Sequence, residues 1–421
     1  MSKSERIEKA YAIAREAYAE FGVDADQAVA NLEKQRISLH CWQGDDIKGF
    51  EIRDDSVVSG NTVTGNYPGR ARNIDEFRAD VEKTLALVGG RHRLALHAIY
   101  LDWPSKVDRD QLEPKHFRSW MDWSRAKDVY IDMNQTYFDH PKANDGLTLT
   151  HPDPEIRKFW IDHGKAMRRI AEALGKNQDS PCVCNLWIQD GLKDIPANRL
   201  VFRQRLLEGL DATFAEKLDE RHLLDSVEPK LFGIGTESFV PGSHEFYLGY
   251  ALSRKKLLTY DTGHFHPTET LADKMTSYFL FNEKLMLHVS RGIRWDSDHV
   301  LNLSDDLIQL VTELVRGDFL SRTFVGLDFF DASINRIAAW TIGLRSIQKA
   351  FLLAFLEPTK RLQNAENSFD YTTRLALMEE QKSMPWSAVW DFFCRKNNVP
   401  VGEDWLSEVK KYEADVLSRR G

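Results

Sequence analysis

The feature that most constrains the fold is a series of eight short apolar runs, which alternate with longer segments of helical spacing. Each run is apolar on both faces, as in parallel strands that helices cover on both sides. The predicted strands are 37–42, 93–99, 129–134, 182–188, 222–228, 256–261, 284–289 and 323–328. The predicted helices between them are 74–88, 154–174, 198–218, 268–282 and 303–316.

Eight strands, most of them followed by a helix, predict an α/β fold of the (β/α)8 type, a TIM barrel. A doubly wound open sheet is the alternative, but it gives no reason for polar residues to gather at the strand ends. We expect residues 1–340 to form the barrel domain with an additional N-terminal helix. Residues 341–421 are expected to form a helical extension, which either caps the barrel or packs against another subunit.

The connection after the first predicted strand, residues 52–73, is long and irregular and contains Gly60, Gly65 and Gly69. Loops of this length in compact domains are often lids over a binding site. The alternative is a surface loop without a role in binding, and the sequence favours neither.

Composition excludes several classes of function. A formal net charge of -8 argues against nucleic acid as a partner. No stretch of about 18 apolar residues is present to span a membrane, and the N-terminus lacks the apolar centre of a signal peptide. Four cysteines without metal-finger spacing favour free thiols in a reducing compartment, so the cytoplasm is expected.

Acidic and imidazole side chains occur at the ends of four successive predicted strands, where a TIM barrel carries its active site. Any one of these acids could instead cap the following helix. A buried group of like charges, however, is opposed by desolvation and by mutual repulsion unless a cation is present. The sequence therefore predicts one or two divalent metals. The strand-end residues are Glu228, Asp261, His288 and Asp328, and the loops that follow add His264, Asp296 and Asp298.

These ligands divide into two groups. The strand-end residues would enclose a central metal, and the loop residues would hold a second one further out. Asp296 and Asp298 are two positions apart, so an extended backbone would direct both side chains the same way. Mixed carboxylate and imidazole ligands suit Mn²⁺, Co²⁺ or Zn²⁺ better than Ca²⁺ or Mg²⁺, and Mn²⁺ is our first expectation.

Residues that could meet a substrate lie at the same end of the predicted barrel. Lys230 follows Glu228 by two positions and could polarise a carbonyl oxygen, although a surface lysine is the alternative. Trp42, His97 and Trp187 lie near the ends of early strands. Flat apolar faces beside hydrogen-bonding groups are what a sugar site requires, but Trp42 and Trp187 fit a core almost equally well. Neither a Ser/His/Asp arrangement nor a phosphate-binding glycine loop is present.

Long motifs point to a known family. They are HCWQGDD (40–46), GNYPG (65–69), LHAIYL (96–101), VEPKLFGIG (227–235), DTGHFHPTE (261–269), RWDSDHV (294–300) and GLDFFDASINRIAAW (326–340). From its N-terminal helix to the closing LSRRG, the chain resembles the L-rhamnose isomerases, which are related to the xylose isomerase type of metal-dependent sugar isomerases. His288 departs from the xylose isomerase pattern, which has a carboxylate there, and so favours softer metals.

The resemblance implies a homotetramer with two Mn²⁺ ions per subunit that interconverts L-rhamnose and L-rhamnulose, with the 52–73 loop closing over the sugar. It implies the same two ligand groups as above. Asp296 or Asp328 would orient the water that takes the O2 proton, Lys230 would stabilise charge on O1, and His264 would contact the sugar as well as a metal. Hydrogen would move from C2 to C1 as hydride or through an enediol. A metal-dependent epimerase or hydrolase, and a sugar-binding protein without catalysis, remain as alternatives.

Overall fold

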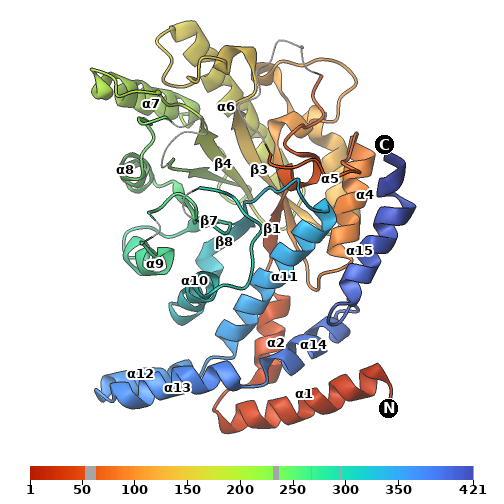
Figure 1. Cartoon of the computed structure of the whole chain (residues 1–421). Helices are drawn as coiled ribbons and strands as arrows, with labels where there is room; N and C mark the ends of the chain where they lie inside the picture. Colours follow the sequence, from red (N-terminus) through yellow and green to blue (C-terminus); the bar gives the residue numbers. More distant parts are fainter. Residues whose placement is uncertain (53–62, 231–236, 267, 294–295, 421) are drawn as a thin grey trace.

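Eight parallel strands close into a barrel in which every strand pairs with its neighbours in sequence and β8 pairs with β1 (Figure 1). The computed structural model describes residues 1–52, 63–230, 237–266, 268–293 and 296–420. The strands are β1 (Ile37–His40), β2 (Arg93–His97), β3 (Tyr130–Tyr137), β4 (Cys182–Ile188), β5 (Leu223–Val227), β6 (Leu257–Asp261), β7 (Leu285–Val289) and β8 (Thr323–Leu327). The predicted (β/α)8 barrel is therefore confirmed.

Three strands end two or more residues away from the predicted position. One of them is β2, which stops at His97 because the 3-10 helix Ala98–Tyr100 follows directly. β1 stops at His40, because the chain turns into the short helix α3 (Trp42–Asp45), in which the Gly44 amide donates to the Cys41 carbonyl. Trp42 thus begins a helix after the strand instead of ending the strand. β3 continues to Tyr137, because β4 pairs with it from Met133 to Tyr137.

Helices surround the barrel in sequence order (Figure 1). They are α4 (Ile74–Leu85), α5 (Arg118–Lys127), α6 (Pro154–Lys176), α7 (Arg199–Thr213), α8 (His244–Arg254), α9 (Leu271–Phe279), α10 (Asp305–Arg316) and α11 (Arg336–Phe355). Neither α5 nor α8 was predicted. Both are short, and both are rich in aromatic residues whose intrinsic preference is for strands. Packing against the barrel outweighs that preference.

The remaining helices lie outside the barrel. They are α1 (Lys3–Glu20), α2 (Ala25–Glu33), α12 (Thr359–Asn367), α13 (Tyr371–Ser383), α14 (Trp386–Lys396) and α15 (Asp404–Asp415). Figure 1 shows α1 beside α14, where the rings of Tyr11 and Phe392 stack with centroids 3.7 Å apart. The same figure shows α12 and α13 projecting from the body as a hairpin. The predicted boundary at residue 340 falls inside α11, and the division into domains stays a prediction.

Two buried carboxylates of the barrel strands, Asp132 and Asp225, are each paired with a buried arginine. The Arg93 guanidinium donates to both oxygens of Asp132, and Arg168 forms a similar pair with Asp225 at 2.8 and 3.0 Å. Lys256 adds a third cation at 2.7 Å from Asp225. All four cysteines are buried and free. Within the described ranges, every helix is too short or too polar to cross a membrane.

Candidate active site

The ends of β5 to β8 bring four predicted ligands together. Asp261 is the last residue of β6 and pairs in register with His288 of β7. Glu228 directly follows β5, and Asp328 directly follows β8. One donor atom from each of the four lies within 4.8 Å of the others. This separation allows all four to bind one cation, as the sequence predicted for the central group.

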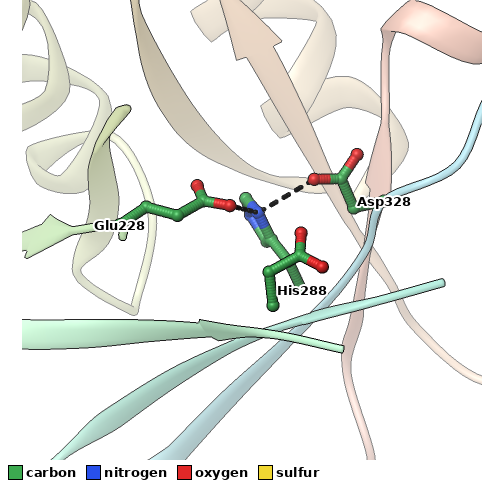
Figure 2. Close-up of side chains that lie close together, drawn as sticks. Glu228, His288 and Asp328 are labelled. Carbon is green, nitrogen blue, oxygen red and sulfur yellow. Dashed lines mark hydrogen bonds and ion pairs between the residues drawn. The ribbon is translucent and has the colours of Figure 1, made fainter. Parts of the chain in front are cut away.

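Hydrogen bonds hold this group in place (Figure 2). Figure 2 shows the Glu228 and Asp328 carboxylates on either side of the His288 ring, whose Nδ1 lies 3.3 and 3.2 Å from them. The second oxygen of each carboxylate is held from behind: Asn185 Nδ2 donates to Glu228 Oε2, and Trp42 Nε1 donates to Asp328 Oδ1 at 3.0 Å. Supporting bonds of this kind fix the orientation of metal ligands. Each carboxylate therefore presents its other oxygen to the centre of the group, beside His288 Nδ1.

A second group forms from Asp261, His264 and Asp296, again within 4.8 Å of one another. His264 Nε2 lies 3.0 Å from Asp296 Oδ2. Gly263 allows this approach, because a Cβ at that position would lie 2.5 Å from Asp296 Oδ1. Among the described residues, Asp261 and not Asp298 completes this group, so the two predicted sites share a carboxylate.

The expected extended backbone through Asp298 is wrong. Asp298 has φ of 41°, in the left-handed region, and its carboxyl lies against that of Asp296. The turn therefore sets its side chain differently from that of Asp296. A role for Asp298 as a metal ligand stays a prediction.

The cluster is short of positive charge. Burial raises the pKa of Asp261 well above its usual value, and neighbouring carboxylates add to this effect against the opposing influence of His264. For His288, burial alone would lower the pKa, but Glu228 and Asp328 raise it well above its ordinary value. Both pKa shifts reflect an excess of negative over positive charge in this cluster. Asp132 and Asp225, by contrast, are each paired with an arginine.

A divalent cation fits the residues present. His264 Nδ1 and Asp296 Oδ1 are buried, and neither has a hydrogen-bond partner among the described residues. Buried polar atoms without partners are rare in proteins and often mark an ion site. Oxygen and imidazole donors are the combination that Mn²⁺, Co²⁺ and Zn²⁺ accept. The donor set, its orientation and its surplus of negative charge all fit such an ion.

The two groups open into one cavity of about 330 Å³, within the size range of small-molecule sites. All the residues that the sequence marked for metal or substrate line this cavity. They are Trp42, His97, Trp187, Glu228, Lys230, Asp261, His264, His288, Asp296, Asp298 and Asp328. Among the described lining residues, Lys230 is the only lysine or arginine.

A row of aromatic rings lines the cavity wall, beginning with Trp42 beside Asp328. The centroids of Trp42 and His97 lie 5.1 Å apart, and Phe138 lies 5.3 Å from His97 and 6.1 Å from Trp187. The Thr136 hydroxyl accepts from the Ala98 amide, so its own hydrogen is available for His97 Nδ1 at 3.0 Å. Burial lowers the pKa of His97 to about 3, so the ring is neutral at pH 7.

Lys230 is held at the edge of this wall. Its Nζ donates to the Gln189 carbonyl and lies 5.2 Å from the centroid of the Trp187 ring. Burial lowers its pKa to about 8, so the group is still mostly protonated at pH 7. The cavity thus contains a charged ammonium group beside an apolar surface.

Sequence reasoning missed Phe138 and Asn185, which line the cavity as well. Phe138 was missed because β3 and the residues after it extend beyond the predicted strand end. An amide inside the otherwise apolar run CVCNLWI was the available signal for Asn185.

Comparison with known proteins places this geometry in a family. The model of the family described as L-rhamnose isomerase (RhaA) matches residues 5–420. The chain belongs to the L-rhamnose isomerase family. The family resemblance drawn from the motifs is thereby confirmed.

Relatives within the family match over nearly their whole length. Proteins named L-rhamnose isomerase from Rhodopirellula baltica (strain DSM 10527 / NCIMB 13988 / SH1) and Salmonella gallinarum (strain 287/91 / NCTC 13346) are 54% and 52% identical. The alignments cover 100% and 99% of this chain and 98% and 99% of those relatives. Among solved structures, a D-psicose 3-epimerase from Clostridium cellulolyticum H10 aligns over 76% of this chain and 98% of its own, with 10% identity and a TM-score of 0.47. That likeness carries nothing about function.

Proposed function

We propose that this protein is an aldose–ketose isomerase that interconverts L-rhamnose and L-rhamnulose. The observation that carries the proposal is the four-donor group at the ends of β5 to β8, which opens into a cavity of sugar size. Relatives that are 51–54% identical over nearly the whole chain are named for this activity. Family membership and site chemistry therefore support the same reaction.

The proposed cofactor is a pair of divalent cations, with Mn²⁺ as first choice and Co²⁺ or Zn²⁺ as substitutes. Glu228, Asp261, His288 and Asp328 would hold one ion, and His264, Asp296 and Asp298 the other, with Asp261 placed to serve both. When bound, such ions polarise a carbonyl oxygen and an adjacent hydroxyl and so lower the barrier to hydrogen transfer between their carbons. The assignment is supported by His264 Nδ1 and Asp296 Oδ1, which are buried and have no hydrogen-bond partner in the described part of the chain.

In this proposal, side chains of the protein assist proton transfer, stabilise charge and bind the sugar. Burial alone would raise the pKa of Asp296, but the nearby His264 keeps it below its usual value, so the carboxylate is ionised. In the proposal, Asp296 or Asp328 orients the water that takes the O2 proton of the open-chain sugar. Lys230 stabilises negative charge on O1. Trp42, His97, Trp187 and His264 bind the sugar, with the aromatic faces against its carbon skeleton.

The direct test is to identify the product that purified protein forms from L-rhamnose with Mn²⁺ present. We expect L-rhamnulose, whereas an epimerase acting at C2 would yield another aldose. Glu228→Gln, which keeps the shape but removes a ligand charge, is the matched control for isomerase carried over from the host. An aldose product, or the absence of turnover at any metal loading, would contradict the proposal. Tritium entering the product from solvent would exclude a pure hydride shift.

We further propose that the protein is a cytoplasmic homotetramer and that the helical extension, residues 341–421, contributes to assembly. At the α12–α13 hairpin, Phe369, Tyr371 and Leu375 are 80%, 54% and 58% exposed. Apolar side chains gathered in this way are typical of contact surfaces.

The native mass in solution tests the tetramer. We expect a species of four 48.5 kDa chains, and expect the double substitution of Tyr371 and Leu375 by serine to shift it to smaller species. The matched control, Leu280→Ser, changes another exposed apolar side chain away from the extension. A monomeric wild-type protein would contradict the proposal.

A further inference from the structure

Residues 413–420 pack against a segment, residues 63–72, whose Thr64 lies at the rim of the cavity. We propose that residues 413–420 brace residues 63–72 at the cavity mouth, and that Glu413 and Arg420 are positioning residues for sugar binding. That the ligand is a sugar rests on the proposed function, whereas the contacts between residues 413–420 and 63–72 are independent of it. The first part of the segment lies at the cavity rim, its middle lies beside the Arg336–Asp46 ion pair, and its last part contacts Leu417 and Arg420.

Its first part lies directly beside the cavity. Thr64 lines the cavity at its exposed rim. The Ala332 amide donates to the Thr64 carbonyl at 3.2 Å, and the Tyr67 amide donates to the Ala332 carbonyl at 2.7 Å. Gly65 has φ of +113°, and a Cβ there would lie 2.3 Å from the Ser333 nitrogen, so only glycine fits. The segment is thus tied to the chain shortly after β8.

Its middle is held by α11 and α15 together. The Tyr67 hydroxyl donates to Glu413 at 2.9 Å, and Asn335 donates to the same carboxylate oxygen at 2.6 Å. Arg336 donates to the Tyr67 carbonyl at 2.8 Å and to both oxygens of Asp46, at 2.8 and 2.7 Å. A single tyrosine therefore joins the segment to two helices.

Its last part lies under the C-terminal turn. Arg420 is 5% exposed and makes two bonds to Asp80 of α4, at 2.5 and 2.8 Å. Its guanidinium also donates to the Gly69 carbonyl, and its own carbonyl accepts from Arg72, each at 3.2 Å. A Cβ on Gly69 would lie 2.6 Å from the Leu417 Cβ. Arg420 and Leu417 thus hold the last part of the segment against α4.

We infer that these contacts increase the affinity for the sugar by ordering the segment before the sugar binds. A loop that must become ordered when the sugar binds loses conformational entropy at that moment, which weakens binding. Figure 1 shows α15 lying along α4, with the C-terminus beside it, so the brace stands on a helix of the barrel. Among the described residues, none of the proposed metal donors is hydrogen-bonded to residues 63–72 or 413–420; the nearest link runs through Ala332, four residues after Asp328. Loosening it should therefore raise KM for the sugar and leave Mn²⁺ binding unchanged.

The test uses Tyr67→Phe, Glu413→Gln and Arg420→Gln in the full-length protein. We expect KM for L-rhamnose to rise about 3- to 10-fold in each, with kcat within about twofold of wild type. Tyr67→Phe combined with Glu413→Gln should be no worse than Glu413→Gln alone, because the Tyr67 hydroxyl bonds only to that carboxylate among the described residues. The matched control is Glu408→Gln, which removes the ion pair to Lys83 of α4 from the same helix without touching the segment.

Hydrogen exchange provides a readout that needs no turnover. Amides between residues 63 and 73 should exchange faster in the three variants but not in Glu408→Gln, while the barrel strands stay protected. An unchanged KM and unchanged exchange would overturn the brace, and so would faster exchange throughout the barrel or a loss of Mn²⁺ affinity. If wild-type protein does not convert L-rhamnose, the proposed function is wrong. Hydrogen exchange of residues 63–73 in the variants would still show whether residues 413–420 hold the segment in place.

Discussion

Exhaustive chelation is expected to abolish conversion of L-rhamnose, and added Mn²⁺ is expected to restore it. The donor group at the ends of β5 to β8 carries surplus negative charge in a buried setting, and His264 Nδ1 and Asp296 Oδ1 have no hydrogen-bond partner among the described residues. Polarisation of a carbonyl by a metal ion contributes several kcal/mol to catalysis, so we expect activity to fall by about a thousandfold.

The same chelation should lower thermal stability, because an ion that binds only the folded state stabilises it by about 2.7 kcal/mol at a concentration of 100 times its Kd. Activity and melting temperature are followed while Mn²⁺, Co²⁺, Zn²⁺ or Mg²⁺ is returned to the metal-free protein. His288→Gln serves as the control that Mn²⁺ should restore poorly, since it removes a donor from the central group. Full turnover after removal of all divalent metal would contradict the assignment.

The barrel could be predicted because its strands are continuous apolar runs, and that pattern is local. Strand ends were less predictable, because they depend on partners elsewhere in the chain. β3 runs to Tyr137 only because Ile188 of β4 pairs with it. Helices α5 and α8 were missed for a related reason, since their aromatic residues become helical through packing that no local pattern contains.

The candidate site could be predicted to the extent that strand ends meet at one edge of a barrel. This geometry brings Glu228 near Asp328 although one hundred positions separate them. Turn conformation was not predictable in this way: the left-handed backbone at Asp298 and the shared use of Asp261 both arise from loops. The predicted 52–73 loop can be compared only from residue 63 onward, because 53–62 lie outside the described residues.

The second large effect is expected from Lys230→Met, which should lower kcat by about a hundred- to a thousandfold. Removing one well-placed group that stabilises developing negative charge costs about this much in enzymes. Lys230 is suited to that role, because it is the only lysine or arginine among the described residues lining the cavity and is still mostly protonated at pH 7. Methionine fills a similar volume against Trp187 without the charge, so the variant should fold.

The measurement separates catalysis from binding by following kcat, KM and Mn²⁺ affinity together. A role at O1 of the sugar requires kcat to fall while Mn²⁺ affinity stays within about threefold. Lys230 contacts the Gln189 carbonyl and the Trp187 ring, and it influences the proposed ligand Asp296 through its charge alone. Lys193→Met is the matched control: it removes the same charge from an exposed position outside the cavity lining and should leave kcat unchanged. A Lys230→Met protein with wild-type kcat would show that the ammonium group is structural, and the charge on O1 would then have to be met by the metal site alone.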